Sequence, residues 1–235
     1  MHPPFRLLFC RVPRLVTTRI VACLLFGAAP LLANPFISEF MADNGSTLAD
    51  EDGEFSDWIE IWNSGDTAGN LNGWFLTDDA ANTTRWAFPS TPLAPGELLV
   101  VFASNKNRAI TGAELHTNFK LSGDGEYLAL VPPDGITPSS AFDPAYPPQF
   151  TDVSYGASPS SATIGYFTEP TPCLENGEPG SGPVGVVEFT PGGQVFAPSL
   201  TVTLSSATPG TTILFTTDVS NSCAIFYIAP TIPRN

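Results

Sequence analysis

Basic residues are scarce in this chain, and nearly half of them lie at its start. Nine lysines and arginines stand against 23 acidic residues, and Arg6, Arg11, Arg14 and Arg19 fall within the first nineteen positions. From residue 34 onward five basic residues remain against all 23 acids, a net charge of −18. Nucleic-acid binding needs clustered Lys and Arg to neutralise phosphates. The charge balance therefore excludes DNA and RNA as partners.

Histidine and cysteine are equally rare. His116 is the only histidine after residue 33, which excludes a multi-histidine metal site and leaves one candidate general base. The chain has no G-x-S-x-G motif to supply the nucleophile of a hydrolase. Cys173 and Cys223 follow the opening segment without CxxC spacing. A single disulfide between them is possible outside the cytosol, and the sequence leaves their pairing open.

No apolar run is long enough to cross a membrane. The longest, Ile20 to Ala33, has 14 residues and contains Pro30, whereas a spanning helix needs about 20. A basic start, a short apolar run and a small residue are typical of a secretory signal. We predict a signal peptide over 1–33, with cleavage after Ala28 or Ala29 as alternatives. The mature chain is then secreted or at the cell surface, without a membrane span.

Helical periodicity is also missing, since no stretch of about eleven residues or more shows it. Short runs rich in Val, Ile, Phe and Trp alternate instead with turn residues such as Asn72-Gly73. This pattern predicts an all-β fold of two packed sheets, with a partly closed barrel as the alternative. The predicted strands are 36–41, 57–63, 73–78, 85–89, 97–104, 126–132 and 150–156.

The composition changes after this region. Residues 157–185 are rich in Pro, Ser and Gly, which predicts an extended linker. Strand patterning returns over 186–218, where Leu200, Val202 and Leu204 alternate with threonines. Residues 219–235 lose the turn chemistry and read as a divergent tail. About fifty residues are marginal for an independent core, so we expect the chain to be the N-terminal piece of a longer protein.

Five ordered motifs carry a family resemblance over 34–156. They are "FISEFMADNG", "DWIEIWNSG", "LNGWFLTDD", "WAFPSTPLAPGELLVVFAS" and "LHTNFKLSGDGEYLALV". Together they resemble the lamin-tail domain in its secreted bacterial form. The resemblance implies an immunoglobulin-like β-sandwich that binds or scaffolds without catalytic residues. Its expected partners are an extracellular protein or a polysaccharide.

A second resemblance covers part of the strand-patterned region after the linker. "FTPGGQVFAPSLTVTLSSATPGTTILFTTD" is similar to the small β-sandwich at the C-terminus of chitobiase and β-hexosaminidase-like proteins, and it departs from them at Val219. In bacterial proteins this pair of modules often precedes a spore-coat-type kinase or another large surface domain. The resemblance thus implies an alternative function, as the accessory targeting region of a larger surface enzyme such as a kinase or a carbohydrate-active enzyme.

Alternation along "DWIEIWN" divides the predicted strand into two faces. Ile59 and Ile61 share one face and are the expected core pair. Trp58, Glu60 and Trp62 share the other and are the candidate binding residues, because exposed aromatic rings stack on sugars or anchor protein partners. The alternative is that loops cover this aromatic face.

The acidic loop 41–57 is the candidate metal site. Asp50, Asp52 and Asp57 could supply oxygen ligands for weak calcium binding. The EF-hand pattern fails, since Phe55 stands where its glycine is required. A solvated loop is the alternative, and no other cofactor is expected. Paired carboxylates of a glycoside hydrolase would need a cleft, which a plain sandwich lacks, so we predict no enzyme.

Overall fold

The computed structural model describes residues 9–11, 33–183, 187–192, 201–206, 212–213 and 227–228. Every regular element in these ranges is a β-strand, and no helix there is long and apolar enough to cross a membrane. The chain forms two compact units, Met1–Gly182 and Pro183–Asn235, and each is described by itself. Most of the predicted signal peptide lies outside the described residues, as does Cys223.

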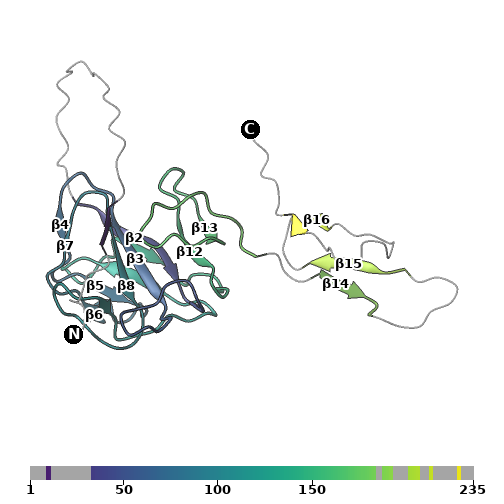
Figure 1. Ribbon diagram of the computed structural model, residues 1–235, viewed down its shortest axis with the longest axis horizontal. Coiled ribbons are helices and arrows are strands. Elements are labelled where there is room, and N and C mark those ends of the chain that lie inside the picture. Colours follow the sequence, from purple (N-terminus) through teal and green to yellow (C-terminus); the bar gives the residue numbers. More distant parts are fainter. Residues whose placement is uncertain are drawn as a thin grey trace, which may run out of the picture. The chain divides into compact units, whose positions relative to one another are not determined.

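The larger sheet of the first unit has seven strands (Figure 1). Their order is β1-β8-β3-β2-β12-β13, with β9 alongside β8, and all pairs are antiparallel except β8–β9. The register of β2 against β3 shifts between Ile37 and Glu39, which marks a bulge. The strands are β1 (Phe9–Arg11), β2 (Pro35–Met41), β3 (Trp58–Asn63), β8 (Glu97–Phe102), β9 (Leu115–His116), β12 (Ser154–Ala157) and β13 (Ile164–Phe167).

The smaller sheet has four strands in the order β11-β10-β5-β6. These are β5 (Phe75–Thr77), β6 (Trp86–Ala87), β10 (Leu128–Val131) and β11 (Ser140–Phe142). A short pair, β4 (Gly69–Asn70) with β7 (Pro92–Leu93), lies outside both sheets. Gly73 has a φ of 78°, a conformation that glycine adopts without strain. The predicted Asn72-Gly73 turn before β5 is therefore confirmed.

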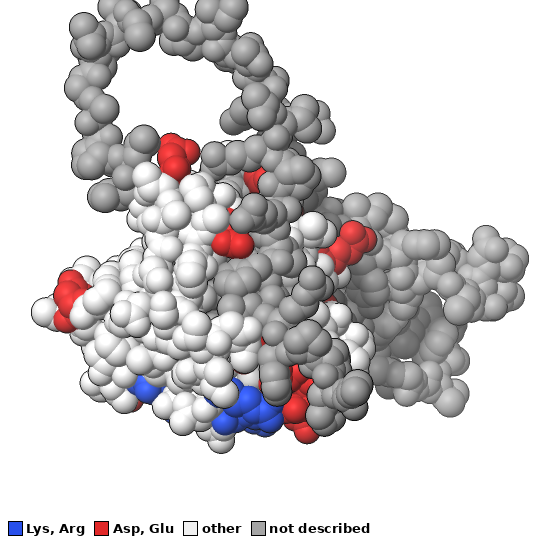
Figure 2. Space-filling model, turned by 60° about the vertical axis from the view of Figure 1, so that its left-hand side comes forward, with Lys and Arg blue, Asp and Glu red and all other residues white. Residues whose placement is uncertain are grey.

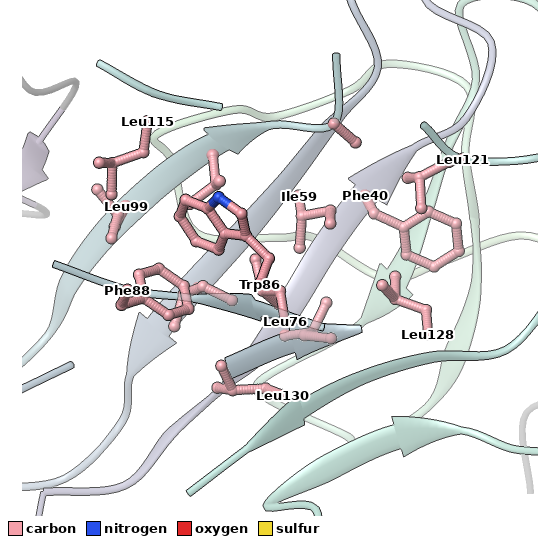
Figure 3. Close-up of a cluster of buried hydrophobic side chains, with 14 of the residues drawn as sticks. Phe40, Ile59, Leu76, Trp86, Phe88, Leu99, Leu115, Leu121, Leu128 and Leu130 are labelled. Carbon is pink, nitrogen blue, oxygen red and sulfur yellow. The ribbon is translucent and has the colours of Figure 1, made fainter. Parts of the chain in front are cut away.

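The main core forms from side chains of both sheets (Figure 3). Ile59 and Ile61 are fully buried in it, as the alternation predicts, and Trp74 packs partly buried against it. The fold prediction is confirmed: the first unit is an immunoglobulin-like β-sandwich. The residues labelled in Figure 3 are Phe40, Ile59, Leu76, Trp86, Phe88, Leu99, Leu115, Leu121, Leu128 and Leu130.

The second unit contains two described strand pairs. β14 (Val187–Thr190) pairs with β15 (Thr203–Ser206), and β16 (Thr212–Ile213) pairs with β17 (Tyr227–Ile228). The strand pattern expected after residue 186 is thus present, and β17 lies in the segment predicted as a divergent tail. The resemblance to the chitobiase-type module stays a prediction.

The predicted linker needs correction. Residues 157–182 belong to the first unit, where β12 includes Ala157 and β13 pairs with β12 along its length. The ring of Tyr166 packs edge-on against Tyr155, with centroids 4.8 Å apart. The prediction rested on a high content of Pro, Ser and Gly, but backbone pairing, aromatic contacts of Tyr166 and hydrogen bonds to Glu39 and Glu60 hold this segment on the sheet.

A glycine-to-alanine pair tests this docking. A Cβ at Gly156 would lie 2.2 Å from the carbonyl oxygen of Ser38, whereas a Cβ at Gly123 would meet nothing within 4 Å. We expect Gly156→Ala to lower the free energy of unfolding by about 2–3 kcal/mol, because backbone must move to admit the methyl group. Gly123→Ala should change it by less than about 0.5 kcal/mol. Equal urea midpoints for the two variants would contradict the docking of β12 on β2.

Candidate functional site

Two glutamates face each other on the outer side of the larger sheet, away from the main core. Glu39 on β2 is directly opposite Glu60 on β3, and both side chains are 0% exposed. Glu60 shares its face with Trp58 and Trp62 because side chains alternate along a strand. A buried carboxyl group requires hydrogen-bond donors to offset the loss of water, and the structure provides them from both sides.

Residues 168–178, here called the strap, supply hydrogen-bond donors to the two glutamates. Thr171 donates its backbone N–H to Oε1 of Glu39 at 3.1 Å and its hydroxyl to Oε2 at 3.0 Å. The backbone N–H of Cys173 donates to Oε2 of Glu60 at 2.6 Å. The two glutamates therefore hold the strap on the sheet through its main chain and one hydroxyl.

The sheet itself supplies the remaining donors. The hydroxyl of Ser38 donates to Oε1 of Glu60 at 2.7 Å, and the hydroxyl of Ser154 donates to Oε1 of Glu39. Each of the four carboxyl oxygens thus accepts at least one hydrogen bond. This is the condition under which buried polar groups are tolerated in folded proteins.

Asn176 fixes the far end of the strap. Its side-chain amide donates to the backbone carbonyls of Ser38 and Ala157, each at 3.0 Å. Its carbonyl oxygen lies 2.8 Å from the hydroxyl of Thr171, whose single proton is shared between this oxygen and Oε2 of Glu39. Asn176 therefore links the strap to β2 and to the end of β12, and it also links two residues within the strap.

Burial sets the charge of the two glutamates. It is the largest cause that raises the pKa of Glu60 to about 8, and the nearby charge of Glu39 acts in the same direction. Burial also raises the pKa of Glu39, against the hydrogen bonds from Ser154 and Thr171. Glu60 accordingly keeps its proton at neutral pH, which removes the repulsion that two opposed carboxylates would suffer.

A groove lies beside the strap on the same face. It is shallow: its roughly 180 Å³ include the space open to solvent, and the enclosed part has room for about one water molecule. Half-buried Trp62 lines it and packs against Phe36, with ring centroids 5.5 Å apart. Leu174, 62% exposed, lines it from the strap. The lining residues are Ser38, Glu60, Trp62, Leu98, Ala157, Pro159, Leu174, Glu175 and Asn176.

The structure separates the three predicted binding residues. Trp58 is fully buried in a small cluster with Met41, Val100 and Phe102, and Leu48 and Cys173 pack against that cluster. Glu60 lies beneath the strap, and Trp62 lines the groove. For Trp58 and Glu60 the alternative holds, in which loops cover this face: Leu48 and Cys173 pack against the cluster of Trp58, and the N–H of Cys173 bonds to Glu60. A binding role for the three residues stays a prediction.

Two of the three predicted calcium ligands lie in one ion cluster. Nζ of Lys106 is 2.5 Å from Oδ2 of Asp50 and 2.7 Å from Oδ2 of Asp52. Hydrogen bonds from Arg108 and Lys106 lower the pKa of Asp52 to about 2. Protein cations thus already neutralise these carboxylates.

The third predicted calcium ligand has a different environment. Burial raises the pKa of Asp57 to about 6, against backbone hydrogen bonds from Asn44 and Leu121. Within the described part of the chain, no group of three or more His, Cys, Asp or Glu residues could hold a metal ion. Calcium binding at Asp50, Asp52 and Asp57 stays a prediction.

The one candidate general base is buried. His116 lies in β9, stacks on Phe102 and has Nδ1 2.8 Å from the hydroxyl of Ser104. Its Nε2 is 3.6 Å from Oε1 of Glu114, too far for a hydrogen bond. The side chain is 0% exposed, so a substrate could not reach it in this conformation.

The comparison with protein families agrees with the fold. Residues 30–141 match the family model described as the Lamin Tail Domain. The match covers β2 to β11 apart from the last residue of β11, and it ends before β12, β13 and the strap. Searches of curated proteins and of solved structures returned no match for this chain. The lamin-tail resemblance is therefore confirmed over the matched residues.

The buried glutamates predict a pH dependence of stability. The raised pKa of Glu60 means that the folded state holds a proton that the unfolded state loses above about pH 4.5. Stability should therefore fall as the pH rises from about 5 through 8. Glu60→Gln, which mimics the protonated acid, should flatten this slope and make the protein more stable than wild type at pH 9.

Glu175→Gln is the matched control, since Glu175 is an exposed acid of the strap. Its urea midpoints should follow those of the wild type at every pH. Parallel pH profiles for wild type and Glu60→Gln between pH 5 and 9 would contradict the assignment.

Proposed function

We propose that this chain is a noncatalytic binding and scaffolding module of a secreted or cell-surface protein. The match to the Lamin Tail Domain supports a binding module. The basic and apolar opening segment supports export. The observation that carries the proposal is the groove at Trp62, because Trp62 and Leu174 are partly exposed there, whereas Trp58 and Glu60 on the same face are covered.

An extracellular protein suits this groove better than a polysaccharide. Sugar-stacking sites present an aromatic ring flat to solvent, whereas Trp62 is half-buried and packed against Phe36. Leu98 and Leu174 add apolar surface, which suits contact with apolar side chains of a protein partner. The same surface would serve if the chain were the targeting region of a larger surface enzyme.

The charge distribution adds a constraint on the partner. The exported chain carries −18, and uncharged residues dominate the face drawn in Figure 2. On that face the few Lys and Arg side chains lie beside acidic ones. Long-range electrostatics therefore favours a basic partner surface over an acidic one.

Binding to cells tests the proposal. Labelled protein of residues 34–235 should bind intact cells of the source organism, and Leu174→Glu should weaken this at least about tenfold by placing a charge in the groove. Ile136→Glu is the control, because Ile136 is 74% exposed and lies outside the groove. Both variants should melt like wild type, as both side chains are largely exposed.

Treatment of the cells distinguishes the partner classes. Protease digestion of the cell surface should abolish binding, whereas periodate oxidation of its polysaccharides should leave it unchanged. Equal binding by Leu174→Glu and Ile136→Glu would contradict the groove, and activity on a polysaccharide by the purified chain would contradict a noncatalytic role.

A further inference from the structure

Two other strands, β1 and β9, pair with the outer edge of β8. β9 pairs only with Val101 and Phe102, at one end of the strand. β1 pairs with Glu97–Leu99 at the other end, in the register Phe9↔Leu99, Cys10↔Leu98 and Arg11↔Glu97. Along its inner edge β8 pairs with β3 without a register shift. Among the residues that the structure describes, only β1 pairs with the outer edge of the first half of β8.

β1 lies within the predicted signal peptide. Cleavage after Ala33 would remove residues 9–11 from the exported chain together with the rest of the leader. An edge that loses its partner strand exposes a row of backbone N–H and C=O groups. Such a row accepts another extended segment, which is the way that several peptide-binding domains recognise their partners.

The hydrogen bonds around β8 show which groups would be exposed. The carbonyl of Phe102 accepts the N–H of Thr117 on the outer side, at 2.8 Å, and the N–H of Ala103 donates to Asp57 on the β3 side, at 2.7 Å. Backbone groups alternate in direction along a strand. Leu98 and Val100 therefore point their N–H and C=O groups to the outer edge.

We propose that this edge of β8, at Leu98 and Val100, is a strand-acceptor site in the exported protein. Its occupant is an extended apolar segment of a partner protein that carries Lys or Arg, added antiparallel as β1 is. The inference deepens the proposed function, and it rests on that function because export must remove the leader. Leu98 also lines the groove, so the added strand and the groove form one continuous binding surface.

The charges near the outer edge of β8 indicate which kind of segment would bind there. Position 11 of β1 is an arginine and pairs in register with Glu97, and a Lys or Arg of an added strand at that position would be favourable opposite an acid. The remainder of the exported chain is strongly acidic, which attracts a basic segment. A second copy of this chain is disfavoured, because two bodies of −18 each would repel.

Amide hydrogen exchange tests the site. The probe is a synthetic peptide of residues 6–12 with Cys10→Ser, added to the exported chain of residues 34–235. At ten times its Kd the peptide should slow exchange at Leu98 and Val100 by about tenfold. The amides of Leu99 and Val101 point to β3 and should be protected with or without peptide. The same peptide with an N-methyl group at position 10 should not protect, because the central donor is blocked.

Three results would overturn the inference. They are unchanged exchange at Leu98 and Val100, equal protection by the N-methylated peptide, and dimers of the exported chain that already protect these amides. Binding to cells is measured separately with Leu174→Glu, so the two proposals can fail independently. If cell binding responds to Leu174→Glu while the peptide protects neither amide, the strand-acceptor site is wrong and the proposed function stands.

Discussion

The opposed pair of Glu39 and Glu60 is the constraint on which the outer face of the larger sheet depends. Two carboxyl groups facing each other across neighbouring strands repel when ionised, and burial adds the cost of lost hydration. The fold meets both costs by keeping Glu60 protonated at neutral pH and by giving each oxygen a donor. Thr171 and Cys173 are among these donors, so without the strap both glutamates would lose hydrogen bonds that only water could replace. The strap is thus part of the domain.

The framework of the sandwich could be predicted from the sequence, and its outer cover could not. Ile59 and Ile61 were predictable as core because alternation fixes the face of each side chain once the strand is identified. Alternation does not say whether a loop covers the opposite face, so the sequence did not decide whether Trp58 is buried. The strap was missed because main-chain donors and short polar side chains hold it, and these have no periodic pattern. One signal was present: Glu39 and Glu60 each lie within apolar runs of predicted strands.

Coverage of the outer face decides where binding can occur. The loop 43–57 and the strap close the face over Trp58 and Glu60, and the cover ends at the groove beside Trp62 and Leu98. Leu98 lies on β8, whose outer edge is paired with a segment of the predicted leader. The match to the Lamin Tail Domain ends at residue 141, so the strap that shapes the groove lies outside the matched residues. The family match alone would not have located this surface.

The buried glutamates hold residues 168–178 on the sheet as folded structure. Amide exchange of Thr171 and Cys173 measures this hold, because their N–H groups donate to Glu39 and Glu60. At pH 6 both amides should be protected like those of the sheet, while the amide of exposed Gly177 in the same strap should exchange much faster. If Thr171 and Cys173 exchange at the rate of an unstructured linker, the glutamates do not hold the strap on the sheet.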